Sequence, residues 1–192
     1  MSDWKKRLVD QLEPVLQLAD PRPAISAYHD MPYAIFRYPP EDEFDLRQEL
    51  ARLRTRLEQS GKRVTSISLS ACLQEALIAV GLEPEALAQA EQSVGLDATV
   101  ETIHEVLSHN QPLDELVAAH IPADADPLRD VVFLTRAGAL FPVYRTSSLL
   151  EQLKGKVAVP AVLFYPGELD GAAGLRFMGV LDAEHNYRPK IY

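Results

Sequence analysis

The strongest pattern along the chain is an apolar stripe of helical spacing that lies between two strand-like segments. Residues 33–38 and 63–69 are rich in aromatic and β-branched side chains, which predicts β-strands. Between them, four leucines recur at intervals of three and four residues on one face of a predicted helix: Leu46, Leu50, Leu53 and Leu57. A strand, a helix and a strand in this order form a βαβ unit, which implies parallel strands and a right-handed crossover.

Two later segments consist almost entirely of apolar residues, which is typical of strands covered on both faces. They are residues 130–135 (DVVFLT) and 159–165 (VPAVLFY). The tail changes character, because residues 175–181 alternate and residues 187–192 contain Pro189, which confines a strand to a sheet edge. We therefore predict a three-layer α/β fold: a mixed, mostly parallel sheet with flanking helices and an antiparallel C-terminal extension.

Helical spacing without a convincing strand dominates residues 70–122. No Gly/Ser linker separates this stretch from the strands around it, so we interpret it as a helical insertion packed on the sheet. Near the N-terminus, residues 4–19 predict an amphipathic helix that Pro14 would kink or divide, and residues 19–32 predict a loop. We expect a single α/β domain over residues 1–192.

The composition restricts the classes of protein that the chain could represent. The formal net charge of −9 disfavours autonomous binding to nucleic acid, because phosphate contacts need a basic surface. Four arginines of the central helix are best explained as a solvated face: Arg47, Arg52, Arg54 and Arg56. The single cysteine, Cys72, allows no internal disulfide and lies in an apolar pattern that predicts burial. With no signal peptide and no long apolar segment, we expect a cytoplasmic protein without membrane contact.

The sequence contains no motif that assigns catalysis or a cofactor. A phosphate-binding loop, a dinucleotide-binding glycine pattern, a G-x-S-x-G nucleophile and the usual zinc spacings are all missing. His104, His109 and His120 could share a metal, but histidines near helix ends are far more often exposed. We therefore expect no enzyme activity, no cofactor and no metal, and we name no catalytic residue.

The stretch FYPGELDG, residues 164–171, raises the question of a site at the edge of the sheet. Pro166–Gly167 fits a type II turn, and Asp170–Gly171 fits a second tight turn. Loops that follow parallel strands open on the edge where α/β proteins bind ligands. This edge should therefore gather five charged side chains: Arg37, Arg136, Arg145, Glu168 and Asp170.

We expect Arg136 and Arg145 to face Glu168 or Asp170 across neighbouring loops. Three interpretations of such an arrangement remain open. The charges could form ion pairs that tie the loops together, or they could contribute to a protein-binding surface. Alternatively, Arg136 and Arg145 could bind a nucleotide or another anion.

Several segments resemble, in order, the BrxB family, a component of bacterial BREX bacteriophage-exclusion systems. They are YAIFRYPPEDEFDLRQEL, DVVFLTRAGALFPVYRTSSLLEQL, VPAVLFYPGELDGAAGLRFMGVL and NYR, and they extend from about residue 33 to the end. The tail departs from the family pattern, because a single Tyr187 precedes Arg188 where paired tyrosines are usual.

The resemblance implies a BREX component with no established catalytic activity. It points to an adaptor role in which the chain binds another BREX protein, with the alkaline-phosphatase-like PglZ as the expected partner. Protein interfaces rest on a few aromatic and arginine anchors. The predicted candidates are Tyr165, Tyr187, Arg188 and Tyr192. The alternative is an α/β nucleotide- or anion-binding module whose site uses the Arg and Asp residues at the sheet edge.

Overall fold

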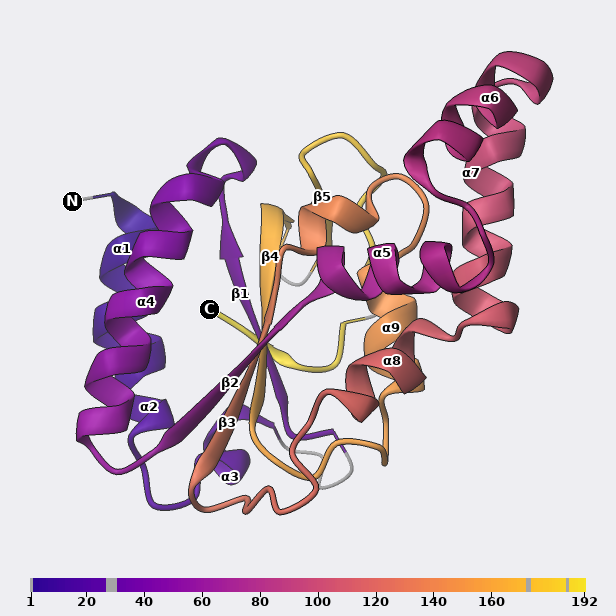
Figure 1. Ribbon diagram of the computed structural model, residues 1–192. Coiled ribbons are helices and arrows are strands. Elements are labelled where there is room, and N and C mark those ends of the chain that lie inside the picture. Colours follow the sequence, from indigo (N-terminus) through magenta and orange to yellow (C-terminus); the bar gives the residue numbers. More distant parts are fainter. Residues whose placement is uncertain (1, 27–30, 172–173, 186) are drawn as a thin grey trace.

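Six strands form one sheet in the computed structural model, which describes residues 2–26, 31–171, 174–185 and 187–192. They are β1 (Tyr33–Tyr38), β2 (Arg63–Ser68), β3 (Asp130–Thr135), β4 (Ala161–Asp170), β5 (Gly174–Phe177) and β6 (Lys190–Ile191). The order β2-β3-β4-β1-β6 is parallel throughout, and β5 pairs antiparallel with the outer half of β4 (Figure 1). Helices cover both faces, so the predicted three-layer, mostly parallel α/β fold is confirmed.

One face of the sheet is covered by the N-terminal helices and the central helix. They are α1 (Asp3–Arg7), α2 (Glu13–Leu16), α3 (Arg22–Ile25) and α4 (Glu43–Gln59), the last preceded by a 3₁₀ turn at Pro40–Asp42. All four leucines of the predicted stripe are buried on α4, against a core that includes Phe36, Phe133 and Phe164 of the sheet. The crossover from β1 to β2 passes over β4 and β3, so the two strands of the βαβ unit are not neighbours.

The N-terminal helix is widened immediately before Pro14. A π-helical turn, Leu8–Leu12, separates α1 from α2, which begins at Glu13. Proline lacks an N–H and its ring crowds the carbonyl four residues earlier, and a wider turn accommodates both effects. The disruption predicted at Pro14 is therefore a widening of the preceding turn. The prediction of a loop over residues 19–32 is wrong at α3, which is a short helix. Residues 27–30 of this stretch lie outside the described residues.

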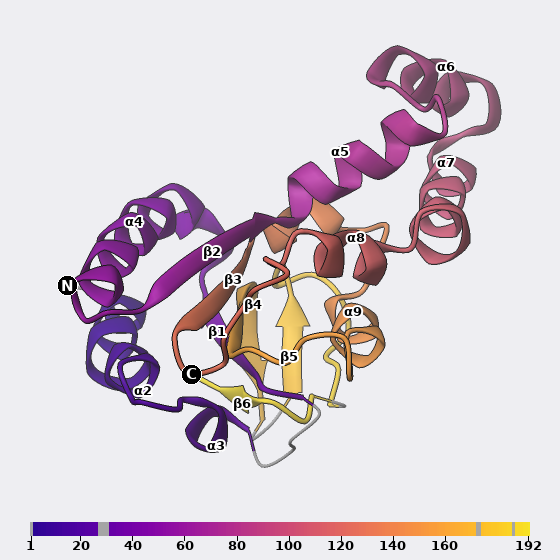
Figure 2. The ribbon, with the colours of Figure 1, turned by 60° about the horizontal axis from the view of Figure 1, so that its bottom comes forward.

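The opposite face carries the helices of the insertion and the helix before β4. They are α5 (Leu69–Ala79), α8 (Leu113–Ala119), α9 (Thr146–Gln152) and a 3₁₀ turn at Ala137–Leu140. Between α5 and α8 lie α6 (Pro84–Val94) and α7 (Leu96–Glu105), which continues into a π-helical turn at Val106–Asn110. Figures 1 and 2 show α6 and α7 projecting together beyond the sheet. All residues of α6 are described, and none of them is buried.

The final strand corrects the predicted direction of the tail. Only β5 is antiparallel, whereas β6 runs parallel to β1, with Lys190 opposite Ala34 and Ile191 opposite Ile35. A tight hairpin would force an antiparallel partner, but the segment between β5 and β6 is long enough to return along the sheet. Tyr192 extends the pairing, because its N–H donates to the carbonyl of Ile35 and its carbonyl accepts from Arg37 N–H.

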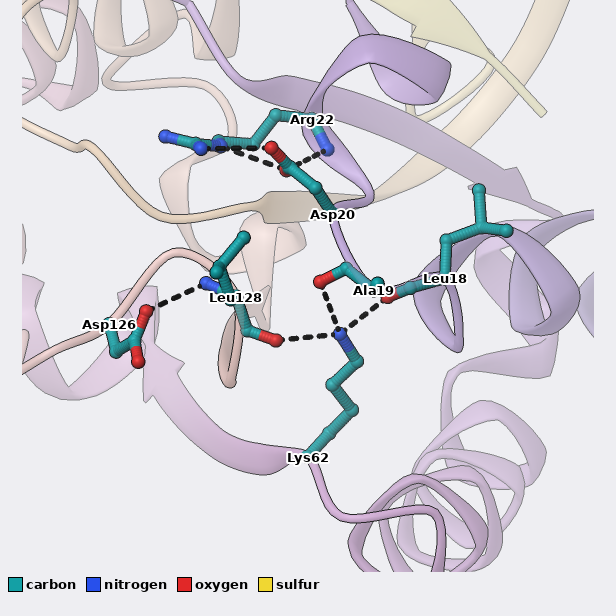
Figure 3. Close-up of polar contacts among 7 residues, drawn as sticks. All are labelled: Leu18, Ala19, Asp20, Arg22, Lys62, Asp126 and Leu128. Atoms are coloured by element: carbon teal, nitrogen blue, oxygen red, sulfur yellow. Dashed lines mark hydrogen bonds and ion pairs between the residues drawn. The ribbon is translucent and has the colours of Figure 1, made fainter.

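A buried lysine joins three segments at the amino edge of the sheet (Figure 3). Lys62 is only 7% exposed, and its ammonium donates to three backbone carbonyls: Leu18 at 2.5 Å, Leu128 at 2.8 Å and Ala19 at 3.3 Å. Burial lowers the pKa of Lys62, although the charges of Asp20 and Asp126 oppose that effect. The three carbonyls use all three ammonium donors, so this lysine fixes the N-terminal segment against the turn before β3.

Candidate functional site

The first candidate site is an open cavity of about 650 Å³ between α9 and the C-terminal tail. From α9 it is lined by Ser147, Ser148, Glu151 and Gln152, and from the tail by His185, Tyr187 and Arg188. Two of the predicted anchors, Tyr187 and Arg188, therefore line a cavity. Arg188 is exposed, whereas Tyr187 is half-buried and presents only part of its ring to solvent.

A hydrogen-bond network fastens the tail to the start of α9. Glu184 accepts from Arg145 and from the Tyr187 hydroxyl, the latter at 3.1 Å. Because Tyr187 donates its one proton to Glu184, the Thr146 hydroxyl is left to donate to Tyr187 at 3.0 Å. We call Arg145, Thr146, Glu184, Tyr187 and Arg188 the tail site.

Electrostatics hold this network in one protonation state near neutral pH. Burial alone would raise the pKa of Glu184, but the hydrogen bonds from Ser147 and Arg145 outweigh it and lower that pKa. Burial raises the pKa of Tyr187 to about 12. The carboxylate therefore stays charged and the phenol stays neutral, which keeps both partners of their hydrogen bond intact.

The other two predicted anchors belong to the core. Tyr165 is fully buried, and its ring lies 5.4 Å from that of Phe177 and 5.9 Å, edge-on, from that of Tyr187. Tyr192 is 5% exposed and lies under the Lys190 ammonium, 4.7 Å from the ring centroid. Tyr165 occurs within the apolar run of a doubly covered strand, and that run is the sequence signal that indicates its burial. At the site, its ring packs against that of Tyr187.

The expected pairing of charges across the sheet-edge loops is wrong. Arg136 Nε lies 3.6 Å from Glu43 Oε1, Arg145 pairs with Glu184, and Asp170 lies 3.5 Å from Arg176. The five predicted charges therefore do not form the expected ion pairs, although Glu168 is near enough for its charge to act on Arg37. The reason is that β4 does not turn at Pro166–Gly167 but continues to Asp170, which carries its acidic residues away from the other loops.

Gly167 serves a close approach of two strands rather than a turn. A Cβ atom built on it would collide with the carbonyl oxygen of Arg176 on β5 and would lie 2.5 Å from the Tyr165 ring. β4 changes partners at this point, because its pairing with β1 ends at Pro166 and its pairing with β5 begins at Gly167. The second predicted turn agrees better with the structure, since Gly171 has a φ of 66°, although residues 172–173 lie outside the described part.

Arg37 is influenced by Arg7 of the N-terminal helix and also by Glu168, another of the predicted charges, which favours its protonated form. Its carbonyl accepts a hydrogen bond from Arg7 at 3.2 Å, and burial together with the Arg7 charge lowers the pKa of Arg37. Among the described residues its buried Nε has no hydrogen-bond partner. Arg37 therefore belongs to the contact between β1 and the N-terminal helix.

A second candidate site is a groove of about 350 Å³ between α4 and the carboxyl ends of β2 and β3. Three guanidinium groups line it, those of Arg47, Arg54 and Arg136, together with the hydroxyl residues Ser66, Ser68 and Thr135. We call it the arginine groove. Arg136 has a φ of 61°, a left-handed conformation that is uncommon for arginine and recurs at functional sites. Sequence reasoning found Arg136 but assigned Arg47 and Arg54 to a solvated face.

The three histidines considered for a metal have separate hydrogen-bond partners. His104 lies 3.0 Å from the Val143 carbonyl, His109 contacts Glu105, and His120 contacts Glu75. Within the described ranges, no group of three or more His, Cys, Asp or Glu residues could hold a metal ion.

Burial raises the pKa of Cys72 to about 11. Among the described residues, no helix is long and apolar enough to cross a membrane.

A family model described as "BREX protein BrxB" matches residues 65–191, two thirds of the sequence. This chain belongs to the BrxB family. A BrxB relative, "BREX protein BrxB" from Bacillus cereus (strain H3081.97), is 28% identical over 182 residues, which cover 94% of this chain and 93% of the relative. No solved structure matches the chain. BrxB membership makes the chain a component of a BREX antiviral defence system, and the family match includes every residue of the tail site.

Proposed function

We propose that this chain is a non-enzymatic assembly component that binds PglZ through its tail site. The observation that carries the proposal is the cavity of about 650 Å³ in which an exposed Arg188 stands beside a Tyr187 that is already fixed in place. Tyrosine and arginine are the residue types that most often dominate binding energy at protein interfaces.

Pre-organisation of the tail favours binding. Tyr187 is held by hydrogen bonds with Thr146 and Glu184 and by the roughly perpendicular contact of its ring with the Tyr165 ring. A partner would therefore lose little side-chain entropy when it orders this surface. The polar lining of Glu151, His185 and Arg188 suits charged or hydrogen-bonding side chains of a protein.

An assembly role rather than catalysis is supported by how the polar groups of the tail site are used. Glu184 is charged and held by Arg145, and the Tyr187 phenol is kept neutral, so neither is poised to exchange a proton near pH 7. The hydroxyl of Thr146 donates to Tyr187 rather than to a base. These contacts stabilise a surface, which is what an adaptor needs.

The test is co-purification of tagged variants with PglZ and with each other BREX protein. We expect the Tyr187→Ala/Arg188→Ala double variant to weaken binding by about 2 kcal/mol or more, which is about thirtyfold. Tyr187→Phe keeps the ring but removes the hydrogen bonds of its hydroxyl with Thr146 and Glu184, and Arg188→Ala changes only an exposed side chain. Phe44→Ala is the matched control, because Phe44 is 73% exposed on α4 and should be neutral.

Equal recovery of the double variant would move the interface away from the tail site. If the wild-type chain associated with none of the BREX proteins, the adaptor role itself would be wrong.

The arginine groove supports a second candidate function, the binding of a small anion. Glu43 pairs with Arg47 at 2.9 Å and Arg136 at 3.6 Å, and Glu58 pairs with Arg54 at 2.7 Å. Three guanidinium groups therefore face two carboxylates, which leaves an excess positive charge beside a hydroxyl-lined groove. If no BREX protein co-purified, saturable binding of inorganic pyrophosphate that Arg136→Gln abolishes would support this alternative.

A further inference from the structure

The negative charge of the chain is concentrated in one segment. Residues 64–128 contain eleven Asp and Glu residues and not one Lys or Arg. The rest of the chain holds all 19 basic residues and the other 17 acidic ones, so it carries a small net positive charge. The formal charge of −9 therefore comes entirely from the segment that contains the insertion.

Six of these eleven acidic residues lie on the projecting pair α6 and α7, which we call the arm, or directly before it at Glu83 (Figure 2). The ion pairs described for residues 64–128 involve Glu75, Glu105, Asp114 and Asp124. Five carboxylates on the arm or at its start have no ion-pair partner among the described residues: Glu83, Glu85, Glu91, Asp97 and Glu101. Uncompensated charges of one sign produce a local field that attracts cations.

The base of the arm also carries an apolar groove. A cavity of about 420 Å³ lies between α5 and α6 and is lined mainly by apolar side chains: Leu73, Leu77, Ile78, Leu82, Pro84 and Leu87. Four of the ten large hydrophobic side chains exposed in the described residues belong to α5, the arm and the turns between these helices: Ile78, Val80, Val94 and Leu96. A hydrophobic groove can receive the apolar face of an amphipathic helix.

We propose that the groove between α5 and α6 binds a basic amphipathic helix of a partner protein. The apolar face of that helix would enter the groove, and its Lys and Arg residues would lie against the free carboxylates of the arm. The same carboxylates repel the phosphates of nucleic acid and of anionic lipid. This repulsion excludes both as occupants of the groove.

A second copy of this chain does not supply the required helix. Its helix richest in cations is α4, whose leucine stripe is buried against its own sheet. The four arginines of α4 already pair with acidic residues of the same chain: Glu43, Glu49, Glu58 and Glu13. The occupant is therefore a segment of another protein, and this surface is separate from the tail site.

The probe is a synthetic helical peptide of about 18 residues, long enough to form a helix, with leucines at helical spacing and lysines elsewhere. We expect the wild-type chain to bind it, and a matched Leu/Glu peptide to bind at least about tenfold more weakly. A scrambled Leu/Lys peptide, which has the same charge but no apolar face, should bind as weakly. Raising the salt from about 50 mM to about 500 mM should weaken binding, because the arm is exposed.

Two variants locate the peptide on the protein. Ile78→Ser changes a half-exposed side chain that lines the groove, and Glu83→Gln/Glu85→Gln/Glu91→Gln removes three charges of the arm. Each should weaken binding about tenfold. The matched controls are Phe44→Ser, also an exposed hydrophobic residue, and Asp10→Asn/Glu41→Gln, which removes exposed charges elsewhere. Both controls should bind the peptide like the wild type.

Equal binding of the Leu/Lys, Leu/Glu and scrambled peptides would overturn the proposal, and so would variants in the groove and arm that bind normally. Sedimentation of the wild-type chain tests the second copy as occupant. A concentration-dependent dimer that Ile78→Ser abolishes would assign the groove to self-association instead.

Discussion

At the scale of single residues, the structure places each of three buried carboxylates beside a partner of opposite sign. Glu13 accepts two hydrogen bonds from Arg56, Asp114 pairs with Lys156, and Asp130 pairs with Arg63. Leaving such a group without its partner costs more than the pair itself contributes, because an uncompensated charge then stays buried. These pairs therefore fix how the segments around them are joined.

Asp130 offers the sharpest test of this principle. Burial would raise the pKa of Asp130, but the hydrogen bonds from Arg63 at 2.5 Å and from Asp126 N–H at 2.7 Å, with the Arg63 charge, outweigh it and lower that pKa. The stabilisation is then complete above the ordinary carboxyl pKa of about 4 and is lost as the pH falls through the lowered value. Asp130→Asn should reduce the free energy of unfolding by about 1–3 kcal/mol at pH 7, and by less in acid.

Urea unfolding at about pH 7 and about pH 3 measures this difference. Asp124→Asn is the control, because Asp124 pairs with the same Arg63 but is 78% exposed, and its loss should change stability little. A cost for Asp130→Asn that stays the same at both pH values would contradict the role of the charge.

At the scale of elements, β4 shows that a strand can continue through a sequence that predicts a turn. Pro-Gly followed by Asp-Gly predicts two turns, yet the strand passes through the first pair and bends only at the second. Pro166 is tolerated because its missing N–H falls where the pairing with β1 ends, and its carbonyl still accepts from Met178 N–H at 2.9 Å. Gly167 is required because β5 comes too close for a Cβ atom.

Gly167→Ala should therefore destabilise the β4–β5 hairpin more than Gly171→Ala does. The new methyl group meets the backbone of β5 and the Tyr165 ring, and such overpacking costs about 1–3 kcal/mol. At Gly171, apart from its chain neighbours, no atom of the described residues lies within 4 Å of the place that a Cβ atom would take, so the positive φ is what opposes alanine, at about 1 kcal/mol. Thermal unfolding of the two variants compares these costs, and the reverse order would show that the close approach does not constrain the hairpin.

Periodicity in the sequence was sufficient to predict the strands of the sheet and the buried face of α4, because each depends on neighbours along the chain. It could not predict strand order, the parallel direction of β6 or the burial of Tyr192, which depend on contacts between distant segments. The candidate site was predicted only in part. Tyr187 and Arg188 were found from the resemblance, whereas Arg145 and Glu184 meet only because the tail folds back onto α9.

At the scale of the whole molecule, the distribution of charge matters more than its total. The value of −9 suggests a uniformly acidic protein, but the acidic excess lies in residues 64–128 and the rest is close to neutral. In the rest of the chain, many of the basic side chains already pair with acidic ones. Few cations are therefore left to contact a phosphate backbone.

We expect the purified chain to bind duplex DNA no more tightly than about 1 μM at about 150 mM salt, since strong binding needs several uncompensated cations. Fluorescence anisotropy with a labelled duplex measures this affinity. The Glu83→Gln/Glu85→Gln/Glu91→Gln variant is an informative control, because it removes repulsion without adding a cation and should also bind weakly. A sub-micromolar dissociation constant for the wild-type chain would contradict the prediction.

The absence of buried side chains on α6 has a consequence for how this protein changes over evolution. A residue in the sheet or on α4 is held by its packing partners, so most substitutions there lower stability. Most substitutions on α6, whose residues are all described and none of which is buried, meet a smaller penalty and can accumulate with less loss of stability. The surface of the arm is therefore free to diverge together with whatever it binds, while close packing restrains change in the scaffold beneath it.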